Sequence, residues 1–121
     1  MEVLTVVSID IAAIFLLGGI LMYNTAKKPI NYMIGYRTKR AMASREAWEY
    51  ANKACGKAWA VMGAAGLVLM LASLLIAAPR VGEQTAALIM GALLAAVIIA
   101  AIAAVVKTEK KLKSIDKGEV L

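Results

Sequence analysis

The chain has 121 residues, of which 62% are hydrophobic, and its formal net charge is +6. Soluble domains are about 45–50% apolar, so this composition excludes an ordinary soluble protein, and its apolar residues gather in three blocks of roughly the 20 residues that cross a bilayer. With no histidine and one cysteine, the chain can form neither an intrachain disulfide nor a zinc-type ligand set. We therefore expect no metal, no cofactor, no catalytic residue and no enzyme.

The first apolar run, residues 3–22, predicts a transmembrane helix that is retained. Its start carries Glu2 in place of the positive charge of a signal peptide, and Leu21–Tyr23 does not resemble a cleavage site. Asp10 lies within this run. An ionised carboxylate at membrane depth costs on the order of 2.5–3.5 kcal/mol, so Asp10 either reaches water near the interface or pairs with a basic group or a ligand.

The polar stretch that follows holds both tryptophans and the only cysteine within residues 31–59. Gly35 stands where a bend or a close backbone approach is easiest. From Ser44, a suitable N-cap followed by Glu46 in the first turn, we predict an amphipathic helix. One face carries Trp48, Asn52, Cys55 and Trp59, and another carries Arg45, Glu49 and Lys53 with two weak i,i+4 ion pairs. This helix either lies in the headgroup plane or continues directly into the second span.

Two further spans are predicted at residues 58–78 and 86–106, joined by a turn over residues 79–85 that makes them an antiparallel hairpin. Small residues recur at i+4 in the second span (Gly56, Ala60, Ala64) and let helices approach closely in lipid. The third span is rich in alanine, and we expect its small faces (Gly91, Ala92, Ala95, Ala96, Ala100, Ala104) to pack against protein. Residues 107–121 are interpreted as a solvated helical tail that frays at Gly118.

The distribution of lysine and arginine predicts the orientation. Eight lie between the first two spans, five in the C-terminal tail, one in the short turn and none before the first span. The positive-inside rule then places the N-terminus outside and the C-terminus in the cytoplasm of a cell-membrane protein. The whole chain, residues 1–121, is predicted to be one all-α, three-span membrane domain with a cytoplasmic motif loop (residues 23–57) and a cytoplasmic tail. Basic residues that flank spans contact lipid headgroups, so we expect no nucleic-acid partner.

Two runs of residues resemble the signature of the SdpI/YfhL-type bacterial membrane proteins. They are Asn31 and Gly35-Tyr36-Arg37-Thr38, followed by Ser44, Trp48, Ala51-Asn52 and Gly56-Lys57. The family takes its name from an immunity protein that acts against a secreted toxic peptide. The resemblance implies an integral membrane protein of immunity, bacteriocin-resistance or signalling type, with no catalytic residues.

The candidate binding residues come mainly from this motif. Arg37 is the first choice, because its guanidinium offers a bidentate fork for a phosphate or carboxylate and stacks on aromatic rings. Tyr36, Trp48 and Trp59 could supply that stacking or anchor the interface, and Asn31 and Asn52 could tie the loop to the helix by side-chain-to-backbone bonds. The remaining candidates are Gly35 and Thr38 in the motif and the pair Asp10 and Arg80. Alternatively, the motif has a structural role alone and folds the loop onto the inner ends of the spans. In both cases we expect Lys39, Arg40 and Arg45 to contact lipid headgroups.

Two functions remain open at this stage. The first is an immunity or signalling protein that binds a secreted toxic peptide or a cytoplasmic regulator. The second is a small transporter or channel subunit that uses Asp10 as its intramembrane ionisable site. On the outer side, Arg80 is the only basic residue, so we predict that Asp10 faces spans two and three and pairs with it. Because three spans rich in small residues bury little surface, we also expect a homo-oligomer, such as a dimer.

Overall fold

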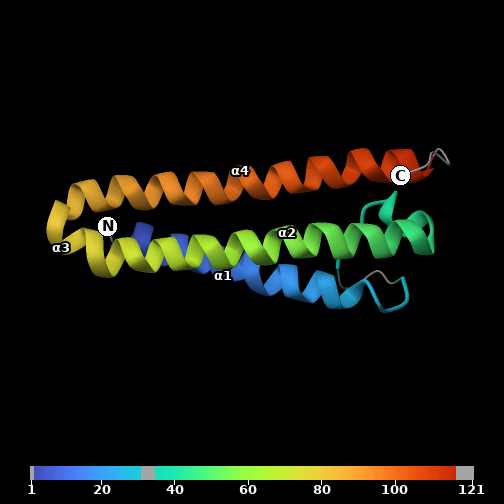
Figure 1. The fold of residues 1–121 in the computed structure, drawn as a ribbon, viewed down its shortest axis with the longest axis horizontal. Helices are drawn as coiled ribbons and strands as arrows, with labels where there is room; N and C mark the ends of the chain where they lie inside the picture. The colour runs from blue at the N-terminus through green and yellow to red at the C-terminus, as the bar shows by residue number, and fades with distance from the viewer. Residues whose placement is uncertain (1, 31–34, 117–121) are drawn as a thin grey trace.

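A computed structural model describes residues 2–30 and 35–116, and this part of the chain is helical without a strand (Figure 1). The long helices are α1 (Glu2–Thr25), α2 (Arg45–Ala72) and α4 (Glu83–Asp116). Shorter pieces are the 3₁₀ turn η1 (Ala41–Ala43), the π-helical η2 (Ser73–Ala77) and α3 (Ala78–Val81). Three stretches are long and apolar enough to cross a membrane: Val3–Thr25, Arg45–Val81 and Glu83–Ile115. The predicted all-α membrane fold is confirmed.

The three long helices lie side by side with α2 between α1 and α4 (Figure 1). The N-terminus lies at the same end of the bundle as α3, and the C-terminal part of α4 lies at the opposite end with the motif loop. We call this opposite end the loop end. Most of the lysines and arginines of the chain therefore gather at one end of the molecule.

Glycines set the close packing of α1 against α2. A Cβ added at Gly56 would lie 2.6 Å from the backbone nitrogen of Tyr23, and one at Gly63 would lie 2.8 Å from the carbonyl oxygen of Ala12. Real Cβ atoms do not approach backbone this closely, so at Gly56 and Gly63 the two helices can be this close only because glycine has no side chain. This confirms the close approach predicted for the second span. It also fixes the antiparallel register, which places Tyr23 beside Gly56.

The interface with α4 is formed by larger side chains. Ala12, Met70, Met90 and Val97 form one buried cluster, and Trp59 connects all three helices. The ring of Trp59 packs edge-on against Phe15 with centroids 4.8 Å apart, and its indole N–H donates to the carbonyl oxygen of Ala101 at 3.3 Å.

Two features of the second hairpin differ from the sequence-based expectations. The turn between spans two and three is shorter than predicted, because helical structure runs to Val81 and resumes at Glu83 with only Gly82 between, at φ +87°. The alanine-rich face of α4 is exposed: Ala92, Ala95, Ala96 and Ala100 point outward, while Met90 and Val97 are buried. A single copy of the chain has too few helices to cover both faces of α4.

The C-terminal tail also differs from the expected solvated extension. Residues 107–116 continue α4, and one face of this segment packs onto the motif loop, with Thr108 and Leu112 buried. The expected fraying at Gly118 lies outside the described residues.

Candidate functional site

The amphipathic helix of the motif loop is the first part of α2 and runs directly into the second span, which decides between the two predicted arrangements. Ser44 caps it as predicted, since its Oγ accepts a hydrogen bond from the Ala47 backbone at 3.1 Å. Trp48, Asn52 and Cys55 are fully buried on one face, and Arg45 and Glu49 form one of the two predicted ion pairs, 3.4 Å apart, on the exposed face.

Trp48 and Arg45 together fasten the C-terminal end of α1 to α2. The indole N–H of Trp48 donates to the carbonyl oxygens of Thr25 at 3.2 Å and Lys28 at 3.1 Å. The guanidinium of Arg45 donates to the carbonyl oxygens of Ala26 at 3.0 Å and Lys28. Carbonyl groups at the end of a helix lack intrahelical partners, so these donors satisfy them.

Asn52, on α2, holds the motif loop in place by hydrogen bonds to the Tyr36 backbone. Its side-chain oxygen accepts a hydrogen bond from the Tyr36 backbone N–H at 2.6 Å, and its amide nitrogen donates to the Tyr36 carbonyl oxygen at 3.3 Å. Gly35 precedes Tyr36 at φ +102°, and a Cβ there would lie 2.5 Å from the Asn52 side-chain oxygen. The predicted tie between Asn52 and the loop, and the close approach at Gly35, are both confirmed.

Tyr36 connects the motif loop to α4. Its ring is buried, and its hydroxyl donates to Glu109 Oε1 at 2.7 Å. Burial raises the pKa of the Tyr36 phenol above its ordinary value, and the hydrogen bond to Glu109 raises it further. Arg40 approaches the other carboxylate oxygen of Glu109, with its Nη1 3.8 Å away. Glu109 therefore joins two residues of the loop to the C-terminal extension of α4.

A groove of about 650 Å³ lies between the motif loop and α4. Thr38, Lys39, Arg40 and Ala43 line it from the loop, and Val105 and Glu109 line it from α4. We call it the basic groove. Thr38 also shapes it, because its hydroxyl accepts the Ala41 N–H at 3.3 Å and its carbonyl accepts the Met42 N–H at 3.0 Å. The side chains of Lys39 and Arg40 are exposed on its rim.

The motif residues thus divide into a buried set and an exposed set. Tyr36, Trp48 and Asn52 are buried and hydrogen-bonded within the protein, and Trp48 has no exposed surface. Trp59 lies within the bundle, where it contacts Phe15 of α1 and Ala101 of α4. Arg37 is exposed, and Asn31 lies outside the described residues.

The predicted pair of Asp10 and Arg80 is wrong. Thr5, Ser8 and Ala12 are the residues of this part of α1 that are buried, and Asp10 is exposed on the opposite side of the helix. Arg80 is exposed on α3, and the ion pairs among the described residues do not join it to Asp10. The error is one of helical phase, because Asp10 lies two residues, about 200°, from Ser8.

Sequence reasoning missed the roles of Glu109 and Arg45. Glu109 lies in a lysine-rich tail that was interpreted as solvated, and Arg45 lies among basic residues that were interpreted as headgroup contacts. A signal for Glu109 was present in the spacing of Val105, Thr108, Leu112 and Ile115, which marks an apolar face along the tail. No such signal marks Arg45, because its carbonyl partners lie across the loop.

The fold and the loop end together define a multi-pass membrane protein with a folded polar layer attached to one end of its spans. Within the described residues, no group of three or more His, Cys, Asp or Glu side chains could hold a metal ion. The model of the SdpI/YfhL protein family matches residues 27–107, about two thirds of the chain, and the chain belongs to this family. Membership supports an immunity-type membrane protein. Neither the curated proteins nor the solved structures contain a match to the chain.

Proposed function

We propose that this protein acts in immunity or signalling by binding an acidic segment of a regulatory partner in the basic groove. The observation that carries this proposal is the construction of the groove. Lys39 and Arg40 are exposed on its rim. The loop that bears them is held by Asn52 at the Tyr36 backbone, by Thr38 at Ala41 and Met42, and by Glu109 at the side chains of Tyr36 and Arg40. A site whose backbone is already ordered loses less conformational entropy when it binds.

The charge of the groove favours an acidic ligand. Among the described residues that line it, Glu109 is the only carboxylate, and Tyr36 and Arg40 already engage its two oxygens. Arg37 is exposed and precedes Thr38, the first residue of the groove lining, and its guanidinium adds positive charge to this part of the loop. Carboxylate groups of a partner can therefore make charge-assisted hydrogen bonds with Arg37, Lys39 and Arg40.

The same contacts offer a route from the groove to the spans. A ligand that draws Arg40 away from Glu109 would weaken the contact between the loop and α4, and Tyr36 would then hold Glu109 alone. We place the loop end in the cytoplasm, because the eight basic residues of the loop and the four in the described part of the tail gather there. The regulatory partner is accordingly cytoplasmic.

A secreted toxic peptide is the second candidate ligand, and a feature at the other end of the bundle favours it. A groove of about 300 Å³ between η2 and α4 is lined by apolar residues and by Ser73. The Ser73 hydroxyl is buried without a hydrogen-bond partner, so it could accept or donate a bond to the backbone of a peptide. With the orientation proposed above, this groove opens on the side from which a secreted peptide arrives.

Charge reversal tests the main proposal. Lys39→Glu/Arg40→Glu should abolish protection or signalling in cells while the protein reaches the membrane in normal amount. Lys107→Glu/Lys110→Glu, which changes two exposed lysines outside the groove, should retain function. Equal activity of the two double variants would refute the basic groove as the binding site. A loss caused instead by Ser73→Leu, with both double variants active, would favour the peptide groove.

A further inference from the structure

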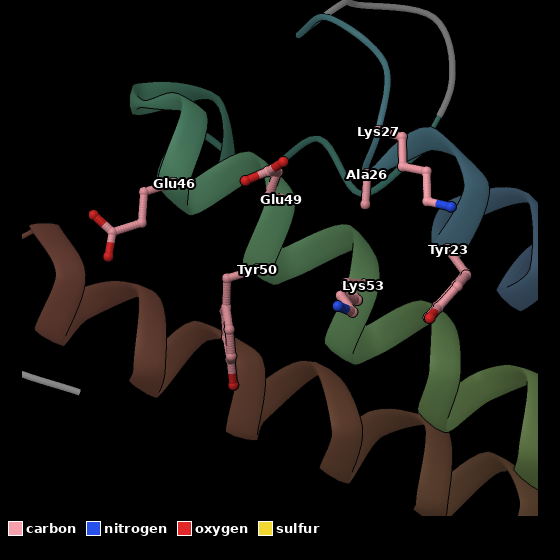
Figure 2. Close-up of a pocket in the computed structure, with 7 residues that line it drawn as sticks. All are labelled: Tyr23, Ala26, Lys27, Glu46, Glu49, Tyr50 and Lys53. Carbon is pink, nitrogen blue, oxygen red and sulfur yellow. The ribbon is translucent and has the colours of Figure 1, made fainter.

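A second groove at the loop end, of about 410 Å³, carries charges of both signs (Figure 2). Glu46, Glu49, Tyr50 and Lys53 line it from α2, where they are spaced i, i+3, i+4 and i+7 on one face of the helix. Tyr23 and Lys27 line it from the end of α1. We call it the mixed-charge groove. Among the described residues, none lines both this groove and the basic groove. It is therefore a site separate from the one proposed above for a regulatory partner.

The charges of this groove are ordered along the membrane normal. Ala58 begins the apolar run of α2, and at 1.5 Å per residue Lys53 lies about 8 Å and Glu49 about 14 Å beyond it. The antiparallel register that places Tyr23 beside Gly56 places Lys27 at the level of Lys53. Two ammonium groups therefore lie nearest the bilayer, and the carboxylates of Glu49 and Glu46 lie farther out. The headgroup layer is about 5–7 Å thick, so the backbone of the lysines stands at its outer boundary and their long side chains can reach into it.

This order matches the headgroup of one class of lipid. In phosphatidylethanolamine, the phosphate is attached to glycerol near the acyl chains, and the primary ammonium group lies at the far end. Lys27 and Lys53 can bind the phosphate, and Glu49 or Glu46 can accept hydrogen bonds from the ammonium group. A phosphatidylglycerol headgroup has no cation for the carboxylates, and the quaternary ammonium of phosphatidylcholine has no N–H to donate.

The helix below the groove can hold the acyl chains. The face of α2 that bears Tyr50 and Lys53 continues through Val61 and Val68, which are exposed. Tyr23, beside Gly56, stands at the level where aromatic rings with a polar tip are enriched in membrane proteins. In Figure 2 the side chain of Lys53 lies between those of Glu49 and Tyr23. Arg45 engages one oxygen of Glu49 at 3.4 Å, which leaves its other oxygen to accept from the lipid.

We propose that the mixed-charge groove is a binding site for the phosphoethanolamine headgroup of a membrane lipid. The lipid is favoured over a soluble phosphoethanolamine compound as the source, because the groove opens at the bilayer surface above an exposed apolar helix face. Bound there, the lipid would fasten the end of α1 to α2.

Native mass spectrometry of the purified full chain, titrated with defined lipids in detergent, tests the proposal. Phosphatidylethanolamine should bind about tenfold more tightly than phosphatidylcholine or phosphatidylglycerol of the same acyl chains, as one additional charge-assisted hydrogen bond would give. Soluble phosphoethanolamine should compete only weakly. Equal binding of the three lipids would overturn the proposal, and competition by soluble phosphoethanolamine at the concentration of the lipid would overturn the choice of a lipid.

Two variants locate the site. Glu49→Lys/Lys53→Glu keeps the composition and the net charge but reverses the order of charges, so it should remove the preference for phosphatidylethanolamine. Lys57→Gln removes one exposed lysine a turn away, outside the groove, and should preserve the preference. If the reversed variant keeps the preference, the headgroup binds elsewhere. The comparison of lipids on the unmodified protein decides the proposal even if the reversed variant fails to fold.

Discussion

Asn52→Ala is the substitution expected to release the motif loop. Asn52 has no exposed surface, and its side chain pairs both the N–H and the carbonyl of Tyr36, at 2.6 Å and 3.3 Å. Leaving a buried backbone group unpaired costs about 1–3 kcal/mol. With both groups of Tyr36 affected, the closed loop should lose about 2–4 kcal/mol relative to the open one.

Cys55 provides the assay for this loss. It is the only cysteine of the chain, and it is fully buried in the cluster that contains Tyr36 and Leu112. Its thiol reacts with a maleimide only when this cluster opens. If opening is fast relative to labelling, a loss of about 2–4 kcal/mol raises the labelling rate roughly 30- to 700-fold.

The matched control is Asn24→Ala, which removes the same side chain from an exposed position on α1 and should leave the labelling rate unchanged. The reasoning would be refuted by labelling of Asn52→Ala within about threefold of the unmodified protein and of this control.

Three further predictions concern the spans. For packing, Gly19→Ala should destabilise the protein to heat in detergent by about 1–3 kcal/mol, because its Cβ would lie 2.6 Å from the Gly56 carbonyl oxygen. The neighbouring Gly18→Ala has open space around its Cβ and should be neutral or slightly stabilising. Equal melting temperatures of the two variants would contradict the close helix contact. For topology, single cysteines in a Cys55→Ser background should be shielded from an impermeant outside reagent at Thr38 and Ser114 and labelled at Glu83; labelling at Thr38 would reverse the orientation. For assembly, Ala96→Cys in the same background, on the exposed small-residue face of α4, should cross-link two copies in membranes, and a monodisperse monomer in nanodiscs would refute the homo-oligomer.

The sequence predicts those parts of the structure that depend on local chemistry. Ser44 as a cap, the buried face through Trp48, Asn52 and Cys55, and the bend at Gly35 all follow from residue type and spacing within one segment. The three spans follow from hydrophobicity alone. These features need no knowledge of which helices are neighbours.

The errors concern the direction in which a helix faces. Asp10 lies in a run that is apolar on all sides, so no amphipathic pattern indicates which side of α1 meets α2. The alanine-rich face of α4 has the same ambiguity, and small residues suit an interface with this chain or with a second copy equally well. The contact of Tyr36 with Glu109 joins positions far apart in sequence, and only the packed arrangement of α2 and α4 brings them together.

Survival of a deletion strain tests the central claim, that the motif loop carries the function, most directly. The strain is challenged with peptides secreted by neighbouring bacteria and complemented with the unmodified protein, Arg37→Ala or Arg37→Lys, each present in the membrane in equal amount. We predict that the unmodified protein protects and that Arg37→Ala does not, because the guanidinium beside the basic groove is lost while no span changes. Full protection by both Arg37→Ala and Arg37→Lys would contradict the account.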